Sequence, residues 1–344
     1  MASLDELTPQ RKRPSIKDVA EKARVSTATV SHVFSGKKHV NDKLAKRVRR
    51  AADDLGYAVD RVASQLRSGR ARVIAVLVPD LEDLFLNRFV SCIEARAESA
   101  GYEVIVSCSR NDPALEMSRL RALMAWRPAG VVAIPCRDSF PNELNGEFAG
   151  TPIVGADRIR PGDATFDTVT IDNFSSGRKT AEHLIAKGAR SILVVTSMVD
   201  LFTAKERVRG AREVVDETEG ATLSVLEIGA EPTAGAERLS AWLASHPKPD
   251  AIVGLTNVTT LAALSTLAKA GLEAPDDMLL IGFHDSLWMT ARKKPVTTVA
   301  QPVDEVARCA WDRLTLRMAG EAAPVQNIML SSTLIERAST MQSR

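Results

Sequence analysis

The stretch IKDVAEKARVSTATVSHVFSGKKHVNDKLAKRVRRAADDLGY, residues 16–57, decides the fold of the N-terminal part of the chain. Its apolar residues recur at helical spacing in three short segments. Ser26 can cap the second segment, and Asn41 or Asp42 can cap the third. Only residues 24–26 separate the first two segments. Two helices joined by so short a turn, with a third helix closing the core, form a helix-turn-helix.

The two faces of these helices differ in character. In the second segment we expect Val30, Val33 and Phe34 to point inward, which leaves Thr27, Ala28, Ser31 and His32 outward. The inner face of the third segment carries Leu44, Val48, Ala52 and Leu55. Its outer face is basic, with Lys43, Lys46, Arg47, Arg49 and Arg50.

Charge is divided unevenly along the chain. Residues 1–72 hold 17 Lys+Arg against 8 Asp+Glu, a net charge of +9, and the remaining residues hold 28 against 35, a net of −7. The whole-chain charge of +2 hides this asymmetry. A compact basic head on an acidic body indicates a part that binds polyanions joined to a part with another task.

Length and composition set the broad class of the protein. A chain of 344 residues is too long for one ordinary core, so two or three domains are expected. With 45% hydrophobic and 26% charged residues, it has the composition of a soluble globular protein. There is no apolar run long enough for a membrane span and no secretory h-region. The scattered cysteines predict buried free thiols in a reducing cytosol and no metal site: Cys92, Cys108, Cys136 and Cys309.

From Arg72 onward, apolar strands alternate with amphipathic helices. The strands include VIAVLVP, EVIVSCS, GVVAIP, PIVGAD, SILVVTS, TLSVLEIG, DAIVGLT and MLLIGFHD. This βαβα spacing predicts parallel sheets covered by helices on both faces. About 270 residues of it suggest two such layers with a cleft at the carboxyl ends of the strands.

Several motifs resemble those of the LacI/GalR-type bacterial transcription repressors. In the basic head these are I-K-D-V-A, V-S-x-x-T-V-S and the L-G-Y ending; in the body they include IDNFSSGRKTAEHL, RVRGA, LLIGFHDS and LIERAST, in the family's order. The resemblance implies a basic tail (1–14), a helix-turn-helix domain (15–58), a hinge (59–71) and a two-lobed, periplasmic-binding-protein-like effector domain (72–340). One lobe would take residues 72–171 and 302–330, and the other 172–301 and 331–340.

The resemblance also assigns the DNA-reading residues. The helix beginning at Thr27 would enter the major groove, where Thr27, Ala28 and His32 read base edges beside Ser31. His32 stands where the family most often has Arg, so it offers a less fixed contact than a two-donor grip on guanine. Arg24 stands where the family usually has Gly, in a turn that favours positive φ at a cost of about 1 kcal/mol for other residues.

The hinge string R-V-A-S-Q-L covers residues 61–66. By resemblance, paired hinge helices pack over the minor groove, with Ala63 at the close contact and Leu66 wedged between base pairs. Val59 and Asp60 replace the family's usual Pro-Asn, so the coupling between hinge order and DNA is expected to be softer. An ordinary polar linker is the alternative interpretation.

In the cleft, the resemblance points to six residues: Asp80, Phe85, Asp157, Arg207, Asn257 and His284. Arg207 would fork onto ligand hydroxyls or a carboxylate, and the alternative is a surface arginine. Phe85 could stack on a sugar or simply pack in the core. Asp157 and Asn257 could equally be capping or supporting groups.

His284 replaces the family's usual Asp and so removes one negative charge from the site. We therefore expect an anionic effector, such as a sugar acid or phosphorylated sugar; the alternative is a neutral sugar or nucleoside. Whether the effector induces or corepresses is left open.

Other functional classes fit less well. The chain has no G-x-G-x-x-G after a strand, P-loop, G-x-S-x-G elbow or H-E-x-x-H, so we expect neither an enzyme with catalytic residues nor a bound cofactor. A solute-binding module without gene regulation would have no use for the basic head. We expect a cytoplasmic, nucleoid-associated bacterial repressor that binds a pseudo-palindromic operator. The tail after Ile335 is short and lacks leucine heptads, so we expect a homodimer and not a tail-mediated tetramer.

Overall fold

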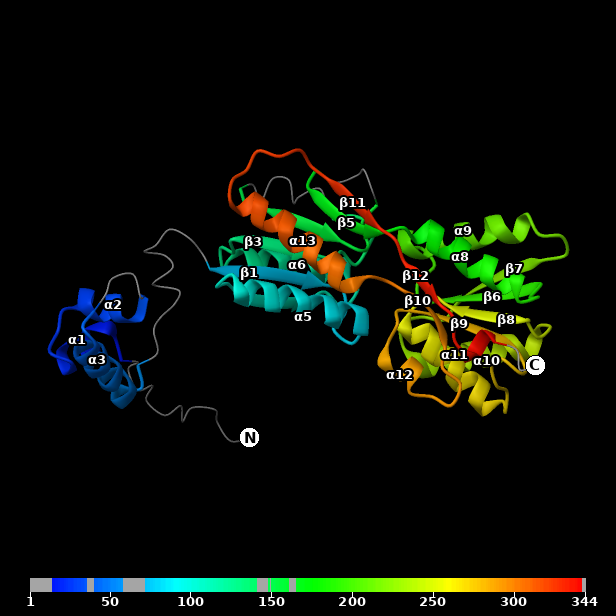
Figure 1. Ribbon diagram of the computed structural model, residues 1–344, viewed down its shortest axis with the longest axis horizontal. Helices are drawn as coiled ribbons and strands as arrows, with labels where there is room; N and C mark the ends of the chain where they lie inside the picture. The colour runs from blue at the N-terminus through cyan, green and yellow to red at the C-terminus, as the bar shows by residue number, and fades with distance from the viewer. Residues whose placement is uncertain are drawn as a thin grey trace, which may run out of the picture. The chain divides into compact units, whose positions relative to one another are not determined.

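The computed structural model describes residues 14–35, 40–57, 72–140, 148, 150–160 and 165–341. The chain divides into two compact units, residues 1–71 and residues 72–344. Figure 1 labels the helices and strands of both units.

The first unit contains the three predicted helices, α1 (Ile16–Lys22), α2 (Thr27–Ser35) and α3 (Asp42–Leu55). Val19, Val30 and Val48 are fully buried at its centre. Local signals in the sequence fix the helix ends. The Asn41 side chain accepts a hydrogen bond from the Lys43 amide at 3.0 Å, and Gly56, with φ +64°, ends α3 in the left-handed region.

Phe34 departs from the prediction that it points into this core. Its side chain is 37% exposed, and its ring lies 6.1 Å from that of Tyr57 between centroids. Val30 and Val33 already fill the inner face of α2, because both are buried. Phe34 therefore covers the edge of the core beside the end of α3.

The second unit contains two six-stranded sheets, in the orders β11-β5-β4-β3-β1-β2 and β12-β10-β9-β8-β6-β7. All neighbouring strands pair in parallel except β10 and β12. The strands of the first sheet are β1 (Val73–Val78), β2 (Glu103–Cys108), β3 (Gly130–Ala133), β4 (Ile153–Ala156), β5 (Asp167–Ile171) and β11 (Asn327–Leu330). Those of the second are β6 (Ser191–Thr196), β7 (Thr222–Glu227), β8 (Ala251–Gly254), β9 (Leu279–Phe283), β10 (Thr297–Ala300) and β12 (Thr333–Ile335).

Helices cover both faces of each sheet (Figure 1). The first lobe consists of the first sheet with α5 (Leu84–Ser99) and α13 (Val303–Met318) on one face and α6 (Pro113–Met124) on the other. The second lobe consists of the second sheet with α8 (Asn173–Ala186) and α9 (Phe202–Asp216) opposite α10 (Pro232–Ser245) and α11 (Asn257–Lys269), together with the short α12 (Leu287–Thr290) and η1 (Ala338–Thr340). The predicted two-lobed α/β core with mainly parallel sheets is confirmed.

The chain passes between the lobes three times: after β5, after β10, and between β11 and β12. The last passage is short, since only Ser331 and Ser332 separate the two strands. Ser332 is buried, and its hydroxyl lies 2.6 Å from that of Ser176 on α8. β11 and β12 each form one edge of their sheet.

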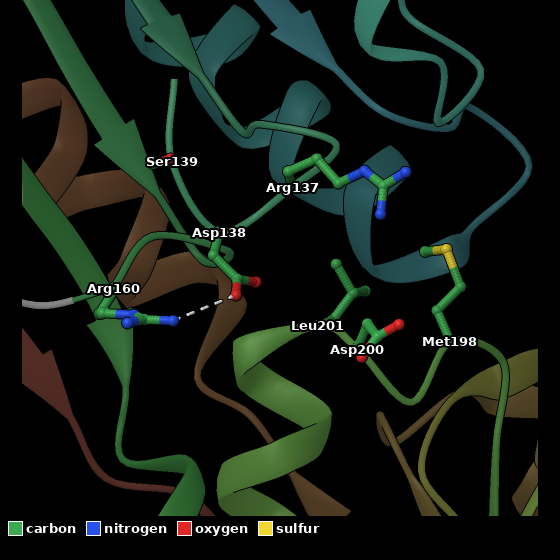
Figure 2. Close-up of a pocket in the computed structure, with 7 residues that line it drawn as sticks. All are labelled: Arg137, Asp138, Ser139, Arg160, Met198, Asp200 and Leu201. Atoms are coloured by element: carbon green, nitrogen blue, oxygen red, sulfur yellow. Dashed lines mark ion pairs between the residues drawn. The ribbon is translucent and has the colours of Figure 1, made fainter. Parts of the chain in front are cut away.

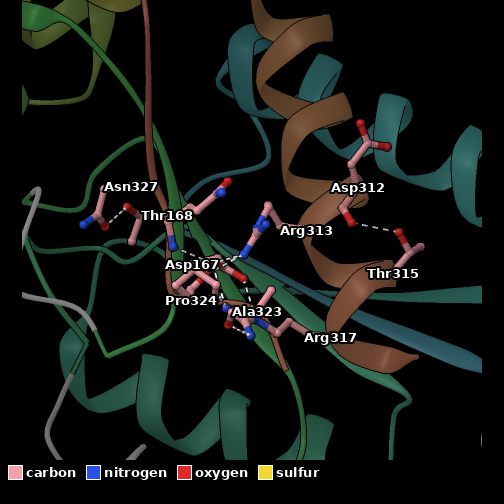
Figure 3. A network of polar contacts seen from close by, with 10 residues as sticks. Asp167, Thr168, Asp312, Arg313, Thr315, Arg317, Ala323, Pro324 and Asn327 are labelled. Atoms are coloured by element: carbon pink, nitrogen blue, oxygen red, sulfur yellow. Dashed lines mark hydrogen bonds and ion pairs between the residues drawn. The ribbon is translucent and has the colours of Figure 1, made fainter. Parts of the chain in front are cut away.

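A buried ionic network ties α13 to the first sheet (Figure 3). The Asp167 carboxylate, at the start of β5, is fully buried. It accepts hydrogen bonds from Arg313 Nη2 and Arg317 Nε, each at 2.8 Å, and from the Gln326 amide at 2.8 Å. Burial by itself raises the pKa of Asp167, but the hydrogen bonds from Arg317 and Arg313 outweigh it and hold that pKa below its usual value. The carboxylate is therefore charged at neutral pH and is paired with both arginines.

Neither a membrane-spanning helix nor a metal-binding cluster occurs in the described part of the chain. None of its helices has the length and apolarity required to cross a membrane. Its histidine, cysteine and acidic side chains form no group of three or more that could hold a metal ion. All four cysteines are free thiols; Cys108 is half-buried and the others are buried.

Candidate DNA-reading surface and effector cleft

The exposed face of α2 carries the residues predicted to read DNA. Thr27, Ala28 and Ser31 are exposed, and His32 is half-buried. Ser26 fixes the start of this helix, because its Oγ accepts a hydrogen bond from the Thr29 amide at 3.1 Å. Exposed side chains near the N-terminal end of such a helix can reach base edges in a major groove.

The turn before α2 has the conformation expected from the sequence. Arg24 has φ +50°, in the left-handed region that glycine adopts more easily. The basic side chains predicted on the outer face of α3 are all exposed: Lys43, Lys46, Arg47, Arg49 and Arg50. Ala63 and Leu66, predicted for the hinge, lie outside the described residues.

Arg207 lies at the centre of the predicted cleft. It belongs to α9 and is only 5% exposed, so it is not a surface arginine. Its Nε donates to Asn173 Oδ1 at 2.8 Å and its Nη1 to the Leu255 carbonyl at 2.7 Å, and its guanidinium lies 4.5 Å from the centre of the Phe283 ring. Burial lowers the pKa of Arg207 to about 10, which leaves it a cation at neutral pH.

Two glycines explain how α9 brings this arginine inward. A Cβ on Gly177 of α8 would lie 1.9 Å from the Arg207 carbonyl oxygen, and one on Gly210 would lie 2.0 Å from the Phe174 carbonyl oxygen. Only hydrogen at these positions lets α8 and α9 pack so closely. The strings S-S-G-R and R-V-R-G-A are therefore both needed to place the guanidinium beside Asn173.

Asp157 and His284 follow two strands, β4 and β9, in the two different lobes. Both are buried non-glycine residues with positive φ, +57° and +63°. Such conformations cost energy and are concentrated at functional sites. Asp157 Oδ1 and His284 Nδ1 are buried and lack a hydrogen-bond partner within the described structure.

Burial also shifts the pKa of both groups. It raises the pKa of the Asp157 carboxyl, and it lowers the pKa of His284 to about 4. The His284 imidazole is therefore neutral at physiological pH, and it adds neither positive nor negative charge to the surroundings of Arg207.

The remaining predicted residues lie on both sides of this centre. The Phe85 ring of α5 lies 4.9 Å from the His284 ring between centroids, so these two side chains meet across the lobes. Asn257, the first residue of α11, accepts a hydrogen bond from Ser286 Oγ at 2.7 Å, while its Nδ2 is buried and has no partner among the described residues. Asp80 Oδ1 accepts from the Glu82 amide at 2.8 Å.

Two cavities lie between the lobes. The inner one measures about 50 Å³ and is lined by Arg207 and Asp80 but not by Phe85, Asp157, Asn257 or His284. The outer one measures about 390 Å³ and shares Met198 and Leu201 with the inner one (Figure 2). The outer volume falls in the range of small-molecule sites.

Several cleft residues were missed by the sequence analysis. Arg158 donates to Asn111 Oδ1 at 2.7 Å, and both line the inner cavity with Asp83, which caps α5 at the Phe85 amide. Asn173, which orients Arg207, was also missed. Arg158 lies just after β4, a predicted strand, and this position was the available signal. Asn173 follows β5, which was not predicted, and its signal was its place in the string IDNFSSGRKTAEHL.

A model of bacterial regulatory proteins, lacI family, matches residues 15–60, and a periplasmic binding protein-like domain matches residues 181–340. The HTH-type transcriptional regulator PtxS of Pseudomonas aeruginosa is 30% identical over 96% of this chain and 97% of its own length. The Escherichia coli ribose operon repressor is 27% identical over 94% and 99%.

Solved structures agree in fold. A lac repressor dimer bound to operator and the anti-inducer ONPF has a TM-score of 0.82 at 24% identity, covering 96% of this chain and all of that one. A complex of the transcriptional regulator CelR with cellobiose has a TM-score of 0.70 at 26% identity, covering 95% of this chain and all of that one.

A helix-turn-helix unit joined to a two-lobed core defines a DNA-binding transcriptional regulator that responds to a small-molecule effector, and not an enzyme. The chain belongs to the lacI family of bacterial regulatory proteins.

Proposed function

We propose that this protein is a homodimeric repressor whose affinity for a pseudo-palindromic operator is controlled by an anionic, sugar-like effector in the interlobe cleft. The proposed class of effector rests on the buried, positively charged side chain of Arg207. It is a buried cation whose hydrogen bonds, among the described residues, go only to the neutral oxygens of Asn173 and Leu255. The Asp157 and Asp83 carboxylates lie near enough to raise the pKa of Arg207, but neither accepts a hydrogen bond from it among the described residues. A ligand carboxylate or phosphate would supply the directly bonded anion that a buried cation favours.

The polar atoms around Arg207 support a polyhydroxylated ligand. Asp157 offers an acceptor, Asn257 a donor, and the neutral His284 ring a nitrogen that can do either. Sugar hydroxyls both donate and accept, so they would satisfy this set. The names of two similar proteins include sugars: the ribose operon repressor and the CelR–cellobiose complex. A neutral sugar or nucleoside is the alternative effector.

Calorimetric titration with gluconate and glucose tests the effector class. We expect gluconate to bind more tightly, and its affinity to change little between pH 6 and pH 8, because His284, with a pKa of about 4, stays neutral over this range. His284→Asp would place a carboxylate near Arg207 and is expected to weaken gluconate binding by about tenfold, about 1.4 kcal/mol. Glucose affinity serves as the control and should change less. Binding of neutral sugars alone would contradict the anionic class.

Regulation then follows from linkage between two sites. The two α2 helices of the dimer would enter two successive major grooves, where the bases are contacted by Thr27, Ala28, Ser31 and His32. Ala63 and Leu66 of the hinge would lie over the centre of the operator. An effector that prefers one lobe arrangement shifts operator affinity, and operator DNA shifts effector affinity by the same factor. This task places the protein on the bacterial nucleoid in the cytoplasm.

Selection of bound genomic fragments identifies the operator and permits a test of its readout. His32→Ala is expected to weaken binding to the selected operator by about 1–3 kcal/mol while leaving binding to unrelated DNA nearly unchanged. Arg50→Ala, on the exposed face of α3, is the matched control. It should weaken both kinds of DNA equally and reduce the salt slope by about one phosphate. Equal losses for His32→Ala on both DNAs would exclude base reading by this residue.

A further inference from the structure

Phe202, the first residue of α9 in the second lobe, is held by two residues of the first lobe. Asp138, in the segment after β3, accepts a hydrogen bond at Oδ1 from the Phe202 amide at 2.6 Å. The Arg160 guanidinium, beyond β4, lies 5.5 Å from the centre of the Phe202 ring. Arg160 Nη2 also lies 3.6 Å from Asp138 Oδ2, as the dashed line in Figure 2 marks.

The start of α9 lacks a cap of its own. Its N-cap residue is Leu201, whose side chain makes no capping bond, and its first turn has no acidic residue. Five other helices of this unit are capped by their own preceding side chains: Asp83, Asp112, Asp172, Glu231 and Thr256. The first amides of a helix have no intrahelical acceptor, so α9 obtains one from the opposite lobe.

We propose that Asp138, Arg160 and Phe202 form an interlobe clasp that holds the two lobes together and fixes the start of α9. The same helix carries Arg207 five residues later. Separation of the lobes would leave the Phe202 amide without its acceptor and free the first turn of α9. Asp138 and Arg160 are thus positioning residues for Arg207; the regulatory consequence rests on the proposed function, whereas the closure does not.

The carboxylate is the principal member of the clasp. Its hydrogen bond is charge-assisted, and a negative charge at a helix N-terminus also interacts favourably with the helix dipole. The side chains of Asp138 and Arg160 are 24% and 51% exposed, and an ion pair this accessible contributes little alone. Arg160 therefore acts mainly by orienting Asp138 and covering the Phe202 ring.

Hydrogen exchange at a single amide tests the closure directly. The full-length chain contains nine phenylalanines, so selective ¹⁵N-phenylalanine labelling gives a simple spectrum, and Phe202→Tyr assigns the Phe202 signal. We expect this amide to exchange at least tenfold more slowly in the wild type than in Asp138→Ala. Asp138→Asn retains an acceptor oxygen and should restore part of the protection.

Asp200→Ala is the matched control, because Asp200 lines the same cavity but pairs with Lys205. It should leave Phe202 protected. The Phe283 amide, inside β9 of the second lobe, should stay protected in every variant and so report that the lobe remains folded. Equal exchange at Phe202 in the wild type and in a folded Asp138→Ala variant would overturn the clasp.

Operator binding without effector then tests the coupling. Asp138→Ala is expected to change affinity for the selected operator by about three- to tenfold, while Asp200→Ala leaves it unchanged. An unchanged affinity in a variant that has lost Phe202 protection would refute the coupling between closure and DNA while leaving the proposed operator function intact. Loss of operator selection in the wild type would instead refute the proposed function.

Discussion

Arg207→Ala is expected to abolish the response of operator binding to the effector while leaving operator affinity without effector within about threefold of the wild type. The reason is geometric: the guanidinium is buried among Asn173, Leu255 and Phe283, and it lines the inner cavity. Operator affinity measured with and without the effector checks this. The expected loss of effector-binding free energy exceeds that for a surface contact, because a desolvated charge pair with a ligand typically contributes several kcal/mol.

A neighbouring arginine supplies the control for this variant. Arg209 lies two residues later on α9, is exposed, and pairs with Glu206. Arg209→Ala should retain the full response. Arg207→Lys keeps the charge but has no planar fork, so we expect an intermediate loss. If Arg207→Ala instead eliminates operator binding in a protein that has lost its cooperative thermal transition, the residue serves structure and not effector recognition.

The second large effect is expected at Asp167. Asp167→Ala should lower the free energy of unfolding of the core by about 3–5 kcal/mol, because it leaves the buried Arg313 and the neighbouring Arg317 without their carboxylate. Urea denaturation followed by tryptophan fluorescence measures it. Asp312→Ala removes an exposed pair with Arg308 on the same helix and should cost less than about 1 kcal/mol. Similar costs for the two variants would contradict the account.

Acid provides an independent measure of the same network. The pKa of Asp167 is lowered in the folded protein, so its stabilisation is fully present above the unfolded value of about 3.9 and is lost as pH falls through the lower folded value. The wild type should therefore lose stability below about pH 4. The difference between the wild type and Asp167→Ala should shrink over the same range, which denaturation at pH 7 and pH 3 would reveal.

Much of the fold could be predicted from the alternation of apolar strand segments with amphipathic helical segments. Each of the eight strands expected from apolar runs has a counterpart, β1 to β4 and β6 to β9. The strands not predicted from such runs, β5 and β10 to β12, have three to five residues each. β11 has the sequence NIML and begins two residues after Val325, and its four residues carry no polar–apolar alternation that distinguishes it from a loop. Phe34 was misplaced because helical spacing alone does not show where a core ends.

The site was less predictable than the fold, for a physical reason. Arg207, Asp157 and His284 were predicted from resemblance to a known family, and the structure shows that all three are buried. Arg158 and Asp138 carried no such string. Their roles arise from contacts with residues that are distant in sequence, Asn111 in one case and Phe202 in the other. A local pattern does not encode which loops meet across a cleft.

The two short strands β11 and β12 give this molecule a particular order of assembly. Each forms the outer strand at one edge of a different sheet, and both come later in the chain than all the other strands of those sheets. During synthesis neither lobe can therefore be completed before residues 327–335 leave the ribosome. A nascent chain stopped at Val325 would expose two unpaired strand edges, β5 and β10, each a template for aggregation.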